Sequence, residues 1–288
     1  MHWRIGVALR AGYNARSYVL RELPMRNATI AAGLLASFVL MSAAQAQTVL
    51  VTGSNRGIGL EFAKQYADRG WTVIATHRRD TTPDTLAALE EQYPAVRAEK
   101  LDVTDHASID ALAEKLAGMP IDVLINNAGI TGDFTKPKPQ TLGTLDYDMA
   151  VHFFRTNALG ALKVSEAFMD NVEASDQKKI VAVSSLAGSF EGESGGKGGI
   201  YWYRSSKAAL NMMMVGVAAD SKRKGVTVAL LSPGTVKVEK VAEMVDRMGL
   251  KGFLEPPESI AGMIDVIENL TPEDSGAFIR YNGEPQPF

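Results

Sequence analysis

The sequence predicts an α/β fold, in which helices cover both faces of one doubly wound sheet of seven, mostly parallel strands. Three observations support this prediction. From Thr48 onward, short apolar runs alternate with helical patterns, as they do when parallel strands are joined by crossover helices. Most of these runs are continuous stretches of Val, Ile and Leu, as expected of strands buried on both faces. The chain has 288 residues, of which 46 % are hydrophobic, so a large core is available.

Seven strands and seven helical segments are expected in alternation. The strands are residues 48–52, 71–76, 96–101, 121–125, 179–184, 226–231 and 277–281. The helical segments lie near residues 57–69, 84–92, 105–117, 145–172, 203–224, 238–248 and 257–269. No linker or internal repeat interrupts this pattern, so residues 48–288 are interpreted as one domain.

The first 47 residues form an N-terminal extension with a different character. Met25-Arg26-Asn27 precedes an apolar run at residues 28–41, and Ala44-Gln45-Ala46 follows it. A basic segment, a short apolar segment and a small-residue cleavage site in this order predict a signal peptide at residues 25–46, with Met25 as the start. The apolar run is too short for a comfortable membrane span. The alternative is a helical or disordered tail.

This segment predicts an exported, periplasmic or membrane-tethered protein whose mature domain has no transmembrane span. Cleavage after Ala46 would leave Gln47 as the first residue, directly before the first strand. Cytoplasmic residence is the alternative, because the cofactor chemistry inferred below needs a nucleotide pool that is not expected outside the inner membrane.

The overall composition excludes several classes of function. A net charge of −3 gives no reason to expect a nucleic-acid partner. The absence of cysteine excludes disulfides, thiol catalysis and cysteine-ligated metals. Three of the four histidines, His77, His106 and His152, lack metal-ligand spacing, and the scattered carboxylates do not suggest a glycosidase or a nuclease. No metal site is expected.

A glycine-rich run, TGSNRGIG, occupies residues 52–59 between the first expected strand and the first expected helix. Backbone N–H groups at a helix N-terminus bind anions, and the helix dipole favours negative charge there. Glycine lets a pyrophosphate approach the backbone closely. Because no Gly-Lys-Ser/Thr follows, the run is not a P-loop. It predicts a dinucleotide site.

Tyr203 and Lys207 are four residues apart and therefore share a helix face. A tyrosine hydroxyl has a pKa of about 10, which a neighbouring ammonium group lowers. Tyr203 could then protonate a carbonyl oxygen as a hydride reaches the carbon, or accept the proton in reverse. Tyr201 is a rival, but it has no lysine four residues later. Such a pair alone is usually a surface pair; here it lies between a Ser-Ser strand end and a run of small residues, which favours catalysis.

These motifs together resemble the short-chain dehydrogenase/reductase family over nearly all of residues 48–288. Further matching motifs are Asp102, Asn-Asn-Ala-Gly at 126–129, Asn157, Ser-Ser at 184–185 and Ser-Pro-Gly at 232–234. The resemblance implies a Rossmann-type fold. The long interval between Ser185 and Tyr203, with the sequence SFEGESGGKGGIYW, resembles the C-factor/sniffer branch of carbonyl reductases.

The resemblance also implies the site residues. The implied catalytic residues are Asn157, Ser185, Tyr203 and Lys207. Ser185 would hydrogen-bond the substrate oxygen, with Ser184 as the alternative, and Asn157 would hold a proton-relaying water. The implied cofactor-binding residues are Gly53, Asn55, Arg56, Gly57, Ile58, Gly59, Arg78, Asp102, Val103, Asn127, Ala128, Gly129, Tyr203, Lys207, Pro233, Gly234 and Val236.

Two segments are expected to shape the substrate site. The insertion at residues 189–202, which contains the Gly-rich loop 192–199, would overhang the nicotinamide, and a lid at about residues 235–258 would cover the substrate. The alternative for the insertion is a flexible loop without function. Many relatives have Thr-Asp or Thr-Asn shortly after the Pro-Gly, whereas this chain has Lys-Val-Glu at residues 237–239.

The second strand indicates the cofactor. It ends without the acidic residue that accepts a hydrogen bond from the ribose of NAD, because Asp80 lies past its tip. Arg56 and Arg78 can instead pair with a 2′-phosphate. NADP(H) is therefore favoured, and NAD(H) is the alternative.

The sequence thus predicts an NADP(H)-dependent oxidoreductase that interconverts a small-molecule carbonyl and an alcohol. The alternative is a non-catalytic nucleotide-binding or signalling protein on the same scaffold, because fold alone does not determine function. The intact set of four catalytic residues favours the enzyme. A homodimer or homotetramer is expected.

Overall fold

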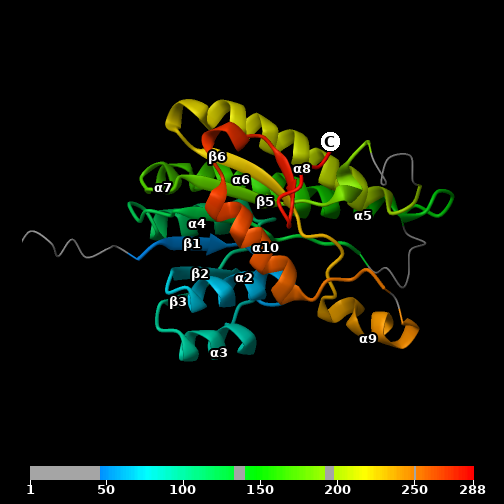
Figure 1. Ribbon diagram of the computed structural model, residues 1–288, viewed down its shortest axis with the longest axis horizontal. Coiled ribbons are helices and arrows are strands. Elements are labelled where there is room, and N and C mark those ends of the chain that lie inside the picture. The colour runs from blue at the N-terminus through cyan, green and yellow to red at the C-terminus, as the bar shows by residue number, and fades with distance from the viewer. Residues whose placement is uncertain (1–45, 133–139, 192–197, 250) are drawn as a thin grey trace, which may run out of the picture. The chain divides into compact units, whose positions relative to one another are not determined.

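The computed structural model describes residues 46–132, 140–191, 198–249 and 251–288. Within them, seven strands form one sheet in the order β3-β2-β1-β4-β5-β6-β7, and every neighbouring pair is parallel (Figure 1). The strands are β1 (Thr48–Val51), β2 (Thr72–His77), β3 (Val96–Lys100), β4 (Val123–Asn126), β5 (Lys179–Val183), β6 (Thr227–Ser232) and β7 (Phe278–Arg280). The doubly wound sheet predicted from the sequence is confirmed.

The strand order reverses between β1 and β4. From β1 the chain builds the sheet outward through β2 and β3, and it then returns to place β4 on the other side of β1. Loops that leave the carboxyl ends of β1 and β4 therefore diverge, which opens a crevice at this point. The glycine-rich run follows β1 and so lies at that crevice.

Helices lie on both faces of the sheet. They are α2 (Gly57–Asp68), α3 (Asp84–Gln92), α4 (His106–Lys115), α5 (Tyr147–Phe154), α6 (Gly160–Ala167), α7 (Met169–Glu173), α8 (Tyr201–Ser221), α9 (Glu239–Met248) and α10 (Pro256–Asn269). Within the described ranges, no helix is both long enough and apolar enough to cross a membrane.

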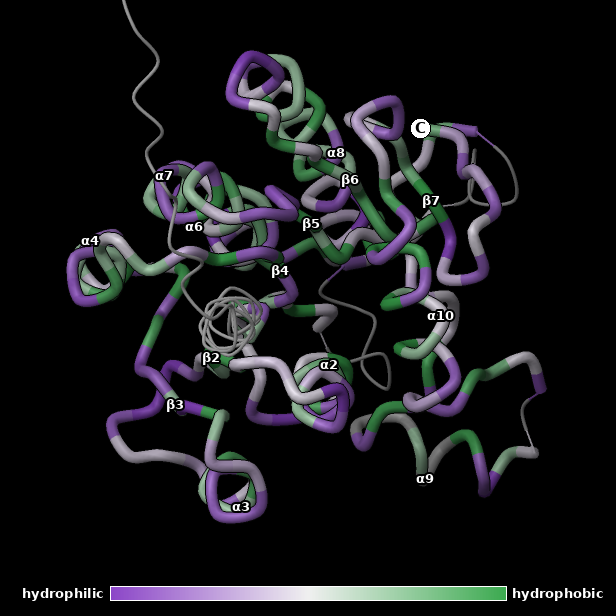
Figure 2. The backbone as a smooth tube through the Cα atoms, turned by 60° about the vertical axis from the view of Figure 1, so that its left-hand side comes forward, coloured by the Kyte–Doolittle hydropathy of each residue, from purple (hydrophilic) through white to green (hydrophobic). Residues whose placement is uncertain are grey.

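Alternate strand residues face two separate cores. Val49 and Val51 of β1 pack with residues of α2, α3 and α10, whereas Leu50 packs with residues of α4, α6 and α8. Continuous apolar strands are needed because neither face is exposed to water. Figure 2 shows the resulting apolar character of β6 and β7.

The expected helical segment at 145–172 is helical but is not one α-helix. It is interrupted by a π-helical turn at Arg155–Leu159, and α6 and α7 are separated at Phe168. The π-turn carries Asn157, whose side chain bonds to groups outside its own helix. Such turns are frequent at functional sites. Apolar periodicity does not reveal them, because it continues across the turn.

The C-terminal tail covers the outer edge of β7. Arg280 donates its N–H to the carbonyl of Glu284, and Gln286 donates its N–H to that of Phe278. Ile279 and Pro285 form an antiparallel bridge. The tail thus satisfies backbone groups that an open sheet edge would expose.

Candidate active site

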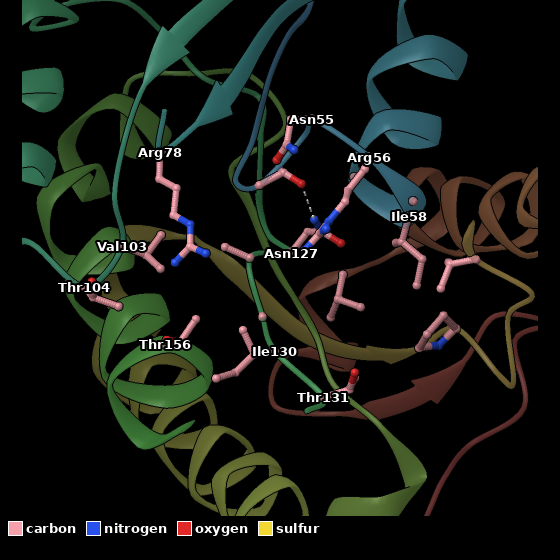
Figure 3. Close-up of a pocket in the computed structure, with 18 of the residues that line it drawn as sticks. Asn55, Arg56, Ile58, Arg78, Val103, Thr104, Asn127, Ile130, Thr131 and Thr156 are labelled. Atoms are coloured by element: carbon pink, nitrogen blue, oxygen red, sulfur yellow. Dashed lines mark hydrogen bonds between the residues drawn. The ribbon is translucent and has the colours of Figure 1, made fainter. Parts of the chain in front are cut away.

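A cleft of about 260 Å³ lies at the carboxyl ends of the central strands. Figure 3 shows Arg78, Val103 and Thr156 on one side of it and Ile58 on the other. Its lining includes fifteen of the predicted residues: Gly53, Asn55, Arg56, Gly57, Ile58, Gly59, Arg78, Asp102, Val103, Asn127, Ala128, Gly129, Tyr203, Lys207 and Pro233. Segments distant in sequence therefore meet here.

The glycine loop needs glycine for two different reasons, a backbone conformation at some positions and a lack of space at another. Gly53 and Gly57 have φ of +70° and +54°, which side chains rarely adopt. Gly59 has an ordinary φ, but an added Cβ there would lie 2.3 Å from the carbonyl oxygen of Gly53. The loop is thus built around close backbone contacts that leave room for a ligand above the N-terminus of α2.

Thr52 and Asn127 join the loop after β1 to the loop after β4. The Thr52 hydroxyl accepts hydrogen bonds from the N–H groups of Asn127 and Ala128, each at 2.9 Å. The Asn127 amide donates to the carbonyls of Thr52 at 2.8 Å and Gly53 at 3.2 Å. These contacts explain why both motifs carry a polar side chain at the strand end: they hold the two walls of the cleft together.

The segment predicted above to form a lid contributes a carboxylate to the cleft. Glu239, the first residue of α9, accepts a hydrogen bond of 3.0 Å from the N–H of Gly57, the first residue of α2. Val238 lies beside Gly57. A Cβ added at Gly57 would be 3.4 Å from the Cγ1 atom of Val238. A carboxylate thus lies on the helix N-terminus, where an anionic ligand would also bind.

The acidic residues near the second and third strands have structural partners. Asp80 forms an ion pair of 2.7 Å with Lys100 and is not part of the cleft lining. Asp102 does line the cleft, and its carboxylate accepts hydrogen bonds from the N–H and the hydroxyl of Thr104 at 2.9 and 2.8 Å. Arg56 and Arg78 are exposed side chains at the cleft.

Lys207 is buried, with 6 % of its surface exposed. Its ammonium donates a hydrogen bond of 2.8 Å to the carbonyl of Val183, at the end of β5. Burial lowers the pKa of Lys207 to about 8, because the charged form loses its hydration. Close packing holds this part of α8 in place, since an added Cβ at Gly188 would lie 2.7 Å from the Lys207 carbonyl carbon.

The expectation that Lys207 lowers the pKa of Tyr203 is wrong for the protein alone. Burial raises the pKa of Tyr203, and a hydrogen bond with Ser185 opposes that rise only in part. Lys207 is not among the groups that shift the Tyr203 pKa, and its ammonium donates to the Val183 carbonyl instead. Tyr203 is therefore a protonated phenol at neutral pH.

The two serines that follow β5 have different partners. Ser184 is buried and donates a hydrogen bond of 2.5 Å to the Asn211 side chain. Ser185 caps the following turn by accepting from the N–H of Ala187 at 3.2 Å, and its hydroxyl opposes the rise that burial causes in the pKa of the Tyr203 phenol. Ser184, rather than Ser185, is part of the cleft lining.

Asn157 lies behind the cleft and is not part of its lining. Its oxygen accepts from the Ile130 N–H at 2.7 Å, and its amide donates to the Ile130 carbonyl at 2.8 Å and to the Ser206 hydroxyl at 2.9 Å. It thus connects the loop after β4 to α8, one residue before Lys207.

Two predicted cofactor residues do not line the cleft. Gly234 has φ of +74° and packs against Leu254 and Tyr281, while Val236 forms a β-bridge with Leu254. Both build the base of the lid. The predicted Gly-rich loop lies mostly outside the described residues, because 192–197 are not among them.

Sequence reasoning missed several residues in the lining: Leu101, Thr104, Ile130, Thr131, Thr156, Val183, Val238 and Glu239. Most of them are neighbours of recognised motifs at strand ends, so their position next to Asp102, Gly129 or Asn157 could have indicated them. Val238 and Glu239 had no such signal, because a long-range contact brings them to the cleft.

Comparison with known proteins gives consistent matches. The family model described as short chain dehydrogenase matches residues 47–249. A 1-hydroxy-2-glutathionyl-2-methyl-3-butene dehydrogenase of Rhodococcus is 35 % identical over 82 % of this chain and 97 % of its own length. The C-signal protein of Myxococcus xanthus is 36 % identical over 62 % of this chain and 99 % of its own.

Solved structures agree with these sequence matches. The NADPH-bound carbonyl reductase from chicken fatty liver has a TM-score of 0.73 and 31 % identity, and the match covers 84 % of this chain and 99 % of that one. The expected likeness to the C-factor and carbonyl reductase branch is thereby confirmed.

Proposed function

Because the chain belongs to the short-chain dehydrogenase family, we propose that it transfers a hydride between NADP(H) and a small carbonyl or alcohol, with Tyr203 as general acid and base. The observation that carries this proposal is that Tyr203 and Lys207 line the same cleft as the glycine loop. A non-catalytic nucleotide-binding protein would not need this pair.

The residues of the cleft fit a dinucleotide. The contact between Gly59 and the Gly53 carbonyl leaves no space for a side chain, so the backbone itself forms the anion cradle. Asn127 and Ala128 would form the floor, with Asp102 and Val103 towards the adenine. When bound, the nicotinamide supplies or accepts the hydride.

Arg56 and Arg78 support NADP(H) over NAD(H). Both line the cleft, and a guanidinium pairs well with a phosphate. The carboxylate that could have indicated NAD, Asp80, is paired with Lys100 instead. The NADPH-bound carbonyl reductase among the similar structures agrees with this choice.

The protonation states favour reduction at neutral pH. Tyr203 retains its proton because burial raises its pKa, so it can donate that proton to a carbonyl oxygen. Ser185 would hold the same oxygen by a hydrogen bond. Lys207, with a pKa of about 8, would bind ribose hydroxyls mainly as an ammonium group at neutral pH. In the oxidative direction Tyr203 must first lose its proton, which requires higher pH.

A substrate screen tests the proposed function. Purified protein is incubated with NADPH or NADH and a panel of aldehydes and ketones, and the loss of reduced cofactor is followed. We expect turnover of some carbonyls, with NADPH preferred. NADPH binding without turnover of any panel member, at any pH tested, would favour the non-catalytic alternative.

Export through residues 25–46 remains a separate proposal, supported by the sequence alone, because residues 25–45 lie outside the described residues. Cell fractionation with N-terminal sequencing tests it. A mature chain that begins at Gln47 outside the cytosol supports export, and a chain that begins at Met1 or Met25 in the cytosolic fraction contradicts it.

Assembly as a homodimer or homotetramer is likewise proposed. Its support is the exposed apolar side chains of Tyr147 and Val151 on α5 and of Met212 on α8. Light scattering on the purified protein tests it. Met212→Glu should reduce the measured mass if copies meet there, and a monomeric parent would refute the proposal.

A further inference from the structure

Gln140 is a buried polar residue that the cofactor site does not use. Only 3 % of its surface is exposed, and it is not part of the cleft lining. Its side-chain oxygen accepts a hydrogen bond of 3.0 Å from the backbone N–H of Tyr203, and its amide nitrogen lies 3.4 Å from the carbonyl of Thr131. A buried amide with these partners needs an explanation, because burying a polar group is costly unless it is bonded.

The explanation lies in how α8 begins. Its N-cap residue is Ile200, which has a left-handed backbone with φ of 41° and no side-chain cap. The first N–H groups of a helix have no partner within the helix, and a Ser, Thr, Asp or Asn at the N-cap usually supplies an acceptor. Isoleucine has none. Gln140, at a separation of 63 residues, supplies the acceptor instead.

The orientation of the Gln140 amide follows from its partners. A backbone N–H can only donate, so the oxygen of Gln140 must face Tyr203. The nitrogen then faces a carbonyl that can only accept. Gly132 provides the space for this arrangement: it has φ of +78°, and an added Cβ would lie 2.6 Å from the Gln140 nitrogen.

We propose that Gln140 is a positioning residue for Tyr203: its bond to the third residue of α8 holds the first turn, and with it the phenol, against Ser185. The inference rests on the proposed function, because it assigns a role to the tyrosine of that site. Gln140 itself is not part of the cleft lining, but both of its partners, Thr131 and Tyr203, are.

The other anchors of α8 act further along the helix. Asn157 holds Ser206, and Val183 holds Lys207. The Ser206 hydroxyl in turn donates to the Tyr203 carbonyl at 2.8 Å, so Asn157 acts on the carbonyl side of Tyr203. Gln140 instead accepts directly from the Tyr203 N–H. Loss of Gln140 would therefore affect Tyr203 more than Lys207.

The decisive variant is Gln140→Met, which keeps the side-chain length and removes the acceptor. Amide hydrogen exchange, followed by mass spectrometry on peptides that contain Tyr203, reports the lost bond directly. We expect that exchange to accelerate by about tenfold or more, with exchange at α10 unchanged. With a substrate found in the screen, kcat should fall by about tenfold while NADPH affinity stays within about twofold.

Gln140→Glu is the conservative rescue. A glutamic acid side chain buried opposite the Thr131 carbonyl should keep its proton, donate it to that carbonyl and still accept from the Tyr203 N–H. It should therefore retain the exchange protection and the kcat of the parent, whereas a variant that only lowers stability would not be rescued by restoring the acceptor.

Asn171→Leu is the matched control. Asn171 is also a buried amide with two hydrogen bonds, to the carbonyls of Leu116 at 2.7 Å and Met119 at 2.9 Å, but these lie in the loop that leads into β4, at the opposite end of that strand from the cleft. Its loss should lower the melting temperature without changing kcat or the exchange of Tyr203.

Two results would overturn the inference. One is unchanged Tyr203 exchange and unchanged kcat in Gln140→Met. The other is an equal acceleration of Tyr203 exchange in Asn171→Leu, which would show a general loss of stability. If no carbonyl is turned over by the parent, the proposed function fails, whereas the exchange measurement still tests the Gln140 contact.

Discussion

Lys207→Met should stabilise the folded protein at neutral pH although it removes a functional group. Burial lowers the pKa of Lys207 from 10.5 to about 8, and a difference of this size corresponds to about 3 kcal/mol of unfolding free energy. The lost hydrogen bond to Val183 opposes this gain by about 2 kcal/mol, because its donor is charged. Methionine has a similar length and no charge to desolvate, so we expect a net gain of about 1 kcal/mol at pH near 7.

The dependence on pH provides a second, sharper check. Below pH of about 8, the pKa of Lys207 in the folded protein, Lys207 is protonated in both the folded and the unfolded state. The folded protein then bears the full free-energy cost of burying a charged ammonium group. Between that value and 10.5 the folded state releases its proton first, so the unfolded state binds more protons and parent stability rises with pH. The advantage of the variant should therefore shrink by about 1.4 kcal/mol per pH unit in this window.

Urea unfolding followed by tryptophan fluorescence measures both effects, at pH near 7 and again near 9.5. Lys64→Met, a substitution of an exposed lysine on α2, is the control and should change the unfolding free energy by less than about 0.5 kcal/mol at either pH. A Lys207→Met protein that is less stable than the parent at neutral pH, or an advantage that does not change with pH, would refute this reasoning.

Three further substitutions test the cleft. Gly59→Ala should abolish cofactor binding, because its Cβ would lie 2.3 Å from the Gly53 carbonyl oxygen. The control is Gly216→Ala in α8, whose Cβ would meet nothing within 4 Å, so this change should be neutral or stabilising. Calorimetric titration with NADPH compares the two variants. The double variant Arg56→Ala, Arg78→Ala should weaken NADPH by at least about tenfold more than NADH, and equal weakening would show that these arginines do not bind the 2′-phosphate. Glu239→Gln should tighten NADPH by about two- to tenfold at low salt, since the Glu239 carboxylate lies on the Gly57 N–H; Glu258→Gln, an exposed change on α10, should not.

The strands were predictable because their chemistry is local and repeated. A parallel strand buried on both faces must be apolar at every position, and seven such runs stand out against helical periodicity. The glycine loop was equally predictable, since its position between strand and helix already determines what its backbone can bind. The choice of Ser185 over Ser184 stays a prediction, because Ser185 opposes the rise that burial causes in the pKa of the Tyr203 phenol, whereas Ser184 is the serine that lines the cleft.

Long-range contacts account for what the sequence did not reveal. Gln140 and Glu239 are ordinary polar residues in sequence, and each acquires its role from a backbone N–H distant along the chain. The pKa of Tyr203 was predicted in the wrong direction for the same reason. Helical spacing places Lys207 on the same face, but it does not show that the Lys207 ammonium is bonded to the Val183 carbonyl, nor how deeply both groups are buried.

The central claim is that Tyr203 transfers the proton, and Tyr203→Phe tests it most directly. The substitution removes the hydroxyl and keeps the ring. We predict that NADPH affinity stays within about twofold of the parent while turnover of the best carbonyl substrate falls by at least about a hundredfold. Turnover within a few-fold of the parent, with the same cofactor affinity, would contradict the assignment of Tyr203 as the general acid.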